Sequence, residues 1–70
     1  MILPSARRHG VGDAAIRHAL AHPVDFHTDD DLTMVIGPDP EGQLLEVGVV
    51  EADDALVVIH AMPARPKYLR

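Results

Sequence analysis

The chain has 70 residues, of which 47% are hydrophobic, and it carries a net charge of −5. This length predicts a single domain, residues 1–70, and the apolar content excludes a disordered polar segment. The sequence has no cysteine, which excludes a disulfide scaffold and a thiolate zinc site, and its acidic balance argues against broad affinity for nucleic acid.

No stretch of the sequence approaches the ~20 apolar residues of a membrane span, and the N-terminus lacks the apolar core of a signal peptide. We therefore expect a cytoplasmic protein that makes no contact with a membrane. A domain of this size buries only about 60% of the surface of its unfolded chain, so partner binding or a homo-oligomer would supplement its stability.

The first third of the sequence predicts one or two helices. Ser5 suits the N-cap of a single helical turn, which Gly10 would end. Asp13 favours the start of a second helix over residues 13–21, and Pro23 ends it. Four small or apolar side chains of this helix fall on one face: Ala15, Ile16, Ala19 and Leu20.

The rest of the sequence predicts an antiparallel β-meander. Residues 24–27 alternate between apolar and polar side chains, which favours a short edge strand. The strands that follow are predicted at residues 32–36, 44–50 and 55–62, with turns at 29–31, 37–42 and 51–54. The predicted fold class is α+β, with one or two N-terminal helices packed on a three- to four-stranded antiparallel β-meander.

Lysine and arginine lie only at the two ends of the sequence. Three of these cations precede residue 18 and three follow residue 64, whereas ten acidic residues lie between them. If the two ends meet in the fold, they form a basic patch that suits an RNA phosphate or an acidic partner. If they do not meet, the cations serve solubility. The six are Arg7, Arg8, Arg17, Arg65, Lys67 and Arg70.

His60 and Glu46 are polar residues within otherwise apolar strands. Strict alternation predicts that four residues of the last strand face the helices: Ala55, Val57, Ile59 and Ala61. His60 then lies on the opposite and more open face, either as a catalytic group or as a partly buried structural residue. Glu46 shares that face if the connecting loop has an odd number of residues, and it points the other way if the number is even. The sequence leaves this open.

The tail after Pro63 carries the residue types that a metal-independent ribonuclease needs. Arginine clamps a phosphate, lysine supplies a point charge, and tyrosine stacks on a base or transfers a proton. We assign the catalytic group to His60, Arg65, Lys67 and Tyr68. In the alternative interpretation, Tyr68 anchors the tail to the sheet and the cations lie in water.

We expect no metal and no cofactor. His18 and His22 stand at i, i+4 on one helical face, but the Glu of the helical zinc-protease motif is absent because position 19 is Ala. Residues 29–31 are three aspartates without the spaced ligands and the glycine of a calcium loop, which favours a solvated turn.

Two segments of the sequence are similar to motifs of a known family. They are Ala6-Arg7-Arg8-His9-Gly10-Val11, before a short helix, and Val58-Ile59-His60-Ala61-Met62, after a Gly/Pro-rich hairpin. They resemble the BrnT-like toxin family, which has a compact RelE-type fold, and a related group of small domains with no assigned function. The resemblance implies a ribonuclease toxin of a type II toxin–antitoxin pair, neutralised by a DNA-binding antitoxin. By position, His9 matches the histidine of the first motif, and Arg65 with Lys67 follow the place of the basic pair in the last.

The first hypothesis is therefore a toxin-like endoribonuclease that acts by general acid–base and electrostatic catalysis. The residues expected to bind its RNA substrate are Arg7, Arg8, His9 and Arg70. The second hypothesis is a non-catalytic binding module, related to such toxins, that acts through an exposed sheet edge or through the basic tail.

Overall fold

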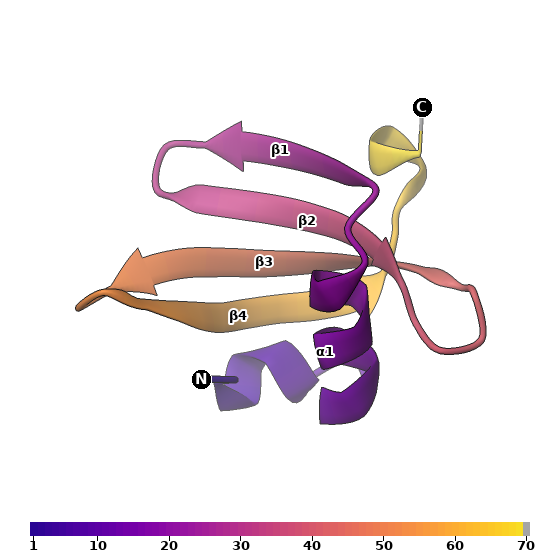
Figure 1. Cartoon of the computed structure of the whole chain (residues 1–70), viewed down its shortest axis with the longest axis horizontal. Coiled ribbons are helices and arrows are strands. Elements are labelled where there is room, and N and C mark those ends of the chain that lie inside the picture. The colour runs from indigo at the N-terminus through magenta and orange to yellow at the C-terminus, as the bar shows by residue number, and fades with distance from the viewer. Residues whose placement is uncertain (70) are drawn as a thin grey trace.

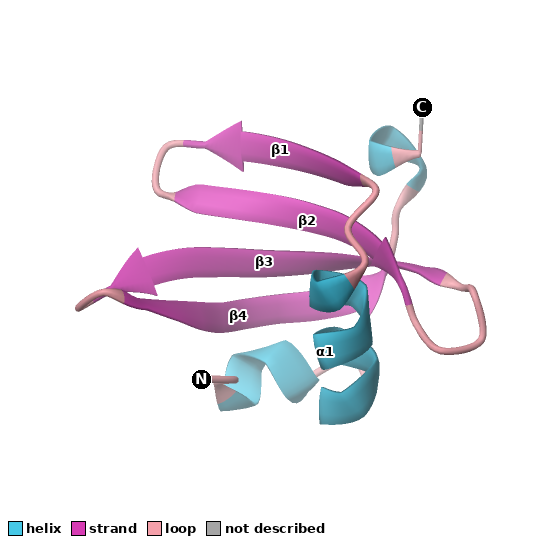
Figure 2. Ribbon diagram, in the orientation of Figure 1, coloured by secondary structure: helices cyan, strands magenta, loops and turns pink. Residues whose placement is uncertain are grey.

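The computed structural model describes residues 1–69 and confirms the predicted α+β class (Figures 1 and 2). A four-stranded sheet has the order β1-β2-β3-β4, and every neighbouring pair of strands is antiparallel. The elements are the 3₁₀ turn η1 (Pro4–Arg7), α1 (Asp13–Ala21), β1 (Asp25–Asp29), β2 (Leu32–Pro38), β3 (Leu44–Ala52), β4 (Ala55–Pro63) and the 3₁₀ turn η2 (Pro66–Tyr68).

The first helical turn differs from its prediction. Leu3, not Ser5, is the N-cap residue of η1, because Pro4 occupies the first helical position, where its fixed φ suits a helix. The Ser5 hydroxyl instead donates a hydrogen bond to the carbonyl of Ile59 in β4, at 2.8 Å. Gly10 adopts a positive φ of 79° after this turn, as predicted for a residue that ends a helix.

One face of the sheet packs against α1 and η1. Ala19 of α1 lies so close to β2 that only glycine fits at position 37. This hydrophobic core consists of Ala6, Ile16 and Ala19 from the helical elements and Val35, Leu45, Val47, Val49, Val58 and Ala61 from the strands. The opposite face of the sheet also has buried residues, because the C-terminal tail crosses it.

A β-bulge interrupts the alternation of β4. Gly48 pairs with His60, whereas the next residue of β3, Val49, pairs with Val58, so that Ile59 is the extra residue. As a result Val58 and Ala61 both face the helices. The prediction that Ala55, Val57, Ile59 and Ala61 share that face is therefore wrong, while the prediction that His60 faces away from the helices is confirmed.

The N-terminal residues cover the outer edge of β4. The amino group of Met1 donates to the carbonyl of Leu56 at 3.0 Å, and Leu3 N–H donates to the carbonyl of Val58 at 2.9 Å. Ile2 forms a parallel bridge with Val58. These contacts fix η1 beside β4 and leave β1 as the outer strand at the other edge. Within residues 1–69, no helix is long and apolar enough to cross a membrane.

Candidate functional site

Glu46 lies at the centre of a polar cluster on the sheet face that is turned away from α1. It is 0% exposed. Its Oε2 accepts a hydrogen bond from Nε2 of His60 at 2.9 Å. Its Oε1 accepts two bonds of 2.9 Å from Arg65, one from the backbone N–H and one from Nε. Nη2 of Arg65 completes the pair at 2.7 Å from Oε2. Both carboxylate oxygens are therefore hydrogen-bonded, as a buried charge requires.

The β-bulge decides that Glu46 and His60 share a face. The β3–β4 turn holds two residues, Asp53 and Asp54, and a two-residue turn alone would place Glu46 and His60 on opposite faces. The extra residue in β4 shifts the register by one, so that Glu46 pairs with Met62 and His60 moves to the same side. A single irregular residue thus creates the pair.

The C-terminal tail folds back over this face. The Cζ of Arg65 lies 5.8 Å, and the Nζ of Lys67 5.1 Å, from the centre of the Tyr68 ring, within the range of cation–π contacts. The ring of His27 in β1 also lies near this tyrosine, 5.0 Å from the Tyr68 ring. The tail therefore reaches across the sheet from β4 to β1.

His9 reaches the same cluster from the other end of the chain. Its ring centre lies 5.8 Å from that of His60, with the two rings nearly perpendicular at 74°. The structure therefore places His60 and Arg65 on Glu46 and His9 next to His60. Lys67 and Tyr68 lie next to them in η2, and Arg8 is exposed beside His9.

Arg7 does not belong to this cluster. Its Nε and Nη2 donate to the two carboxylate oxygens of Asp13, at 2.9 and 2.8 Å, which joins η1 to the start of α1. This ion pair joins Arg7 to α1, so Arg7 makes no contact with Glu46, and its role in binding the substrate stays a prediction. Arg70 lies outside the described residues.

The sequence indicated Glu46 as an unusual residue without placing it in the site, and it did not indicate His27 at all. A carboxylate in the middle of an apolar strand was the available signal, because such a group is rarely buried without a partner. His27 had no comparable signal, since its neighbour Tyr68 is distant in the sequence. In residues 1–69, no three His, Cys, Asp or Glu side chains are grouped so that they could hold a metal ion.

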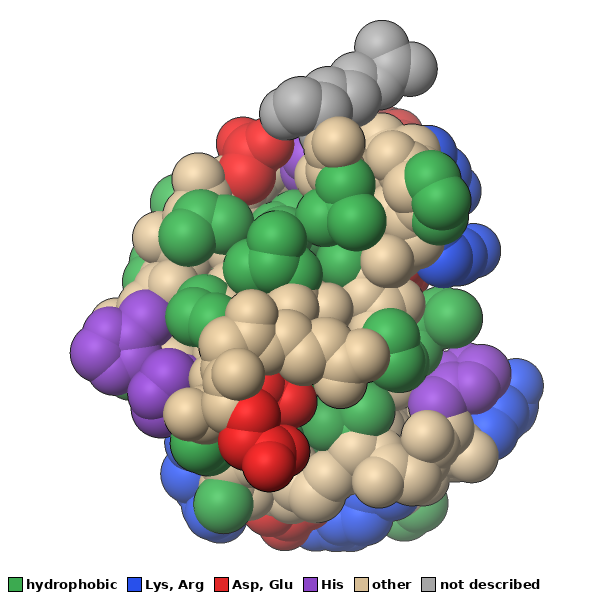
Figure 3. Space-filling model, turned by 90° about the vertical axis from the view of Figure 1, so that its right-hand side faces the viewer, with side chains coloured by type: hydrophobic (Ala, Val, Ile, Leu, Met, Phe, Trp, Pro, Cys, Tyr) green, Lys and Arg blue, Asp and Glu red, His purple; other side chains and the backbone are tan. Residues whose placement is uncertain are grey.

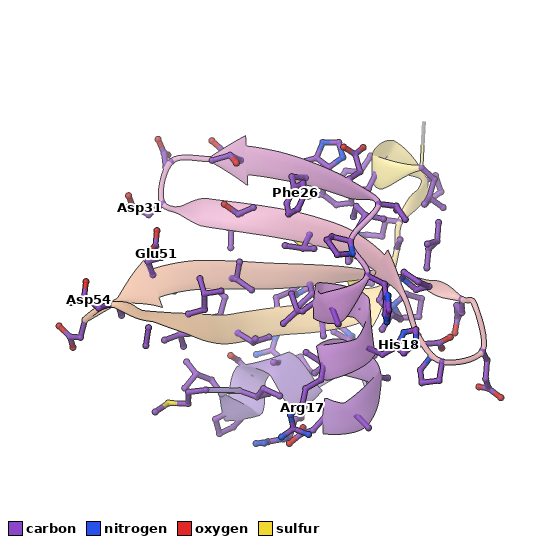
Figure 4. The ribbon with its side chains drawn as sticks, viewed as in Figure 1. Arg17, His18, Phe26, Asp31, Glu51 and Asp54 are labelled. Atoms are coloured by element: carbon purple, nitrogen blue, oxygen red, sulfur yellow. The ribbon has the colours of Figure 1, made fainter. Side chains whose placement is uncertain are left out.

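A hollow of about 380 Å³ in the described surface lies elsewhere and contains none of the predicted site residues. It is found at the end of the sheet where the β1–β2 and β3–β4 turns lie. Asp31, Glu51 and Asp54 mark this end in Figure 4, and their acidic side chains point outward. This hollow is unsuited to a phosphate, because its surroundings repel anions.

The hydrogen bonds from Arg65 and His60 determine the charge of Glu46. Burial by itself raises the pKa of this carboxyl, but the hydrogen bonds from the side chain and backbone of Arg65 and from His60 outweigh it and lower the pKa to about 2. Glu46 is therefore an anion at neutral pH.

Protonation of Glu46 in acid should lower the free energy of unfolding. Since the pKa of Glu46 falls from 4.5 to about 2 on folding, its contribution is fully present above about pH 4.5 and is lost as the pH falls through about 2. The difference corresponds to about 3 kcal/mol of unfolding free energy. Urea denaturation at a series of acidic pH values measures it. Glu46→Gln should flatten this part of the pH dependence, and an unchanged slope in that variant would contradict the assignment.

Comparison with protein-family models, with curated proteins and with solved structures finds no match to this chain.

Proposed function

We propose that this protein cleaves RNA by attack of a ribose 2′-hydroxyl on the adjacent phosphate, at the cluster of His9, His60 and Arg65. The observation that carries the proposal is the buried carboxylate of Glu46, which holds both His60 and Arg65 in place while His9 lies 5.8 Å from His60. Two imidazoles and a guanidinium at one place are the groups that proton transfer and phosphate stabilisation require.

Glu46 prepares His60 to act as a base. A carboxylate without a proton only accepts hydrogen bonds, so Nε2 of His60 carries the hydrogen in the bond to Glu46. In the neutral ring the other nitrogen, Nδ1, then holds the lone pair. Nδ1 accepts the proton of the 2′-hydroxyl, and the negative charge of Glu46 stabilises the imidazolium that results.

His9 supplies the second proton transfer. As the 2′-oxygen bonds to phosphorus, the bond from phosphorus to the 5′-oxygen breaks, and His9 in its protonated form donates a proton to that leaving oxygen. The products are a 2′,3′-cyclic phosphate and a 5′-hydroxyl. His9 and His60 finish with their protonation states exchanged, and water restores them.

Arg65 and the tail bind the phosphates. Glu46 occupies Nε and Nη2 of Arg65, but Nη1 makes no bond to that carboxylate, and 44% of the side chain is exposed. Nη1 is therefore able to donate to a phosphate oxygen as its charge increases in the transition state. Lys67 adds charge for a neighbouring phosphate, and Tyr68 is an aromatic ring of the kind on which a base stacks. Figure 3 shows Lys and Arg side chains next to histidine along one side of the molecule.

The resemblance to the BrnT-like toxins supports the same proposal, because it implies ribonuclease activity and a DNA-binding antitoxin as the partner. We propose such an antitoxin as the partner protein. Growth arrest on expression of this chain, relieved by expression of a neighbouring gene, tests the pairing directly.

The decisive experiment incubates the purified protein with a defined single-stranded RNA in the presence of EDTA. Wild type should yield fragments that end in a cyclic phosphate, and His9→Ala should cleave about 100-fold more slowly because it lacks the proton donor. His9 is exposed, so this variant should fold normally. Arg17→Ala, which removes an exposed charge on α1, is the control and should cleave like wild type. Intact RNA with folded wild-type protein would overturn the proposal.

A second function is favoured by the open edge of the sheet. β1 is the outer strand, and two large apolar side chains at this edge are exposed, Val24 at 63% and Phe26 at 58%. A strand of a partner protein could pair with this edge. If the RNA stays intact, a binding module of this kind becomes the better proposal, and charged substitutions at Phe26 should then abolish capture of its partner.

A further inference from the structure

The carboxyl end of α1 carries a second pair of histidines, away from the cluster around Glu46. His18 and His22 are four residues apart, so their side chains project from the same side of the helix. Their ring centres lie 4.5 Å apart, and the rings are inclined by 42°. No other two histidine rings among the described residues lie closer together. His22 is exposed, and His18 is half-buried.

The ring of His18 is held in the state that a metal ion needs. Its Nδ1 lies 2.8 Å from the carbonyl oxygen of Pro38, at the end of β2. Because a carbonyl only accepts hydrogen bonds, Nδ1 carries the hydrogen, and Nε2 of the neutral ring has a free lone pair. Metal-binding histidines commonly donate their other ring N–H to a backbone carbonyl, which orients the ring and raises the basicity of the ligating nitrogen.

His22 is free to complete the pair. It is the C-cap residue of α1, and its backbone N–H donates to the carbonyls of His18 and Ala19, which fixes its position relative to His18. Its side chain is exposed. Two nitrogens that each lie about 2.0 Å from one ion are about 3 Å apart, a separation that rotation of the exposed ring can reach.

The surroundings distinguish this pair from His9 and His60. His60 and the guanidinium of Arg65 both contact the carboxylate of Glu46. The positive charge of Arg65 next to His60 disfavours binding of a cation there and favours binding of an anion. In the part of the chain that the structure describes, no lysine or arginine forms a hydrogen bond or an ion pair with His18 or His22. Arg17 and His18 lie on different sides of α1 (Figure 4), and His18 is directed towards the β2–β3 turn.

We infer that His18 and His22 form a binding site for a divalent transition-metal ion such as Ni²⁺, Cu²⁺ or Zn²⁺. Imidazole nitrogen suits these ions, and affinity is expected to be highest for Cu²⁺. The site is separate from the cluster proposed for RNA cleavage. With two protein ligands, the ion keeps positions for water or for ligands from another molecule.

The test titrates the tag-free, metal-free full chain with NiCl₂ near neutral pH and measures the heat of binding. Wild type should show saturable binding, and His22→Ala should weaken it about 10-fold or more. His9→Ala is the matched control, because it breaks up the other histidine pair, and it should bind Ni²⁺ like wild type. Unchanged affinity in His22→Ala, or loss of binding in His9→Ala alone, would overturn the inference, as would an absence of binding by wild type.

A second measurement covers the case in which His22→Ala changes the fold. Nitrogen-15 spectra of the imidazoles, recorded while Zn²⁺ is added, identify the ligating nitrogen in the wild-type chain. We expect Nε2 of His18 to shift while its Nδ1 keeps its hydrogen, because Nδ1 remains bonded to the carbonyl of Pro38. A shift that places the metal on Nδ1 of His18, or on His9 and His60, contradicts the site.

Discussion

Arg65→Leu should lower the free energy of unfolding by about 3–5 kcal/mol, because it removes the main partner of a buried charge. Glu46 is 0% exposed, and in this variant its carboxylate keeps only the hydrogen bonds from His60 and from the backbone N–H of residue 65. A domain of this size is stable by roughly 4–10 kcal/mol in total. The variant is therefore close to unfolding, and urea denaturation followed by circular dichroism measures the loss.

Removal of the other partner, in Glu46→Leu, should lower the free energy of unfolding by less than Arg65→Leu does. Such a difference would show that the loss in Arg65→Leu comes from the unpaired buried charge. Glu46→Leu leaves Arg65 without its partner, but the Arg65 side chain is 44% exposed and can be hydrated. The double variant Glu46→Leu/Arg65→Leu should recover much of the stability lost in Arg65→Leu, since it buries no charge. Lys67→Leu removes a nearby cation that does not touch Glu46, and it should change stability by less than about 1 kcal/mol. Equal losses in Lys67→Leu and Arg65→Leu would contradict a buried ion pair.

Gly37→Ala should destabilise the protein by about 3 kcal/mol, because the added methyl group has no space. An ideal Cβ at position 37 would lie 2.2 Å from the carbonyl oxygen of Ala19 and 2.9 Å from its carbonyl carbon. Both atoms belong to the backbone of α1 and cannot rotate away, so the helix has to move off the sheet. Thermal and urea unfolding measure the loss.

Gly12→Ala is the matched control for this substitution. Gly12 precedes α1 with an extended φ of −74°, and no atom lies within 4 Å of an added Cβ. It is the N-cap residue, where alanine is somewhat less favourable than glycine, so a change of at most about 1 kcal/mol is expected. If Gly37→Ala behaves like Gly12→Ala, then α1 does not pack as closely on β2 as the structure indicates.

The fold class could be predicted because its signals are local. Gly10 and Pro23 end helical segments through their own backbone preferences, and the apolar runs of β2, β3 and β4 are separated by turn residues. Asp53 and Asp54 both adopt positive φ in their turn, which is a property of a short segment. Sequential strands joined by short turns then pair as antiparallel neighbours with little alternative.

The sequence by itself determined the helix, the order of the strands and the concentration of cations at the two ends. Only the tertiary structure decided which of these groups meet. One extra residue, Ile59, shifts the register of β4 and turns His60 towards Glu46, and no local preference in the sequence reports that shift. Arg7 and Arg65 are similar in sequence terms, yet the first binds Asp13 and the second binds Glu46, because side-chain pairing depends on the approach of distant segments.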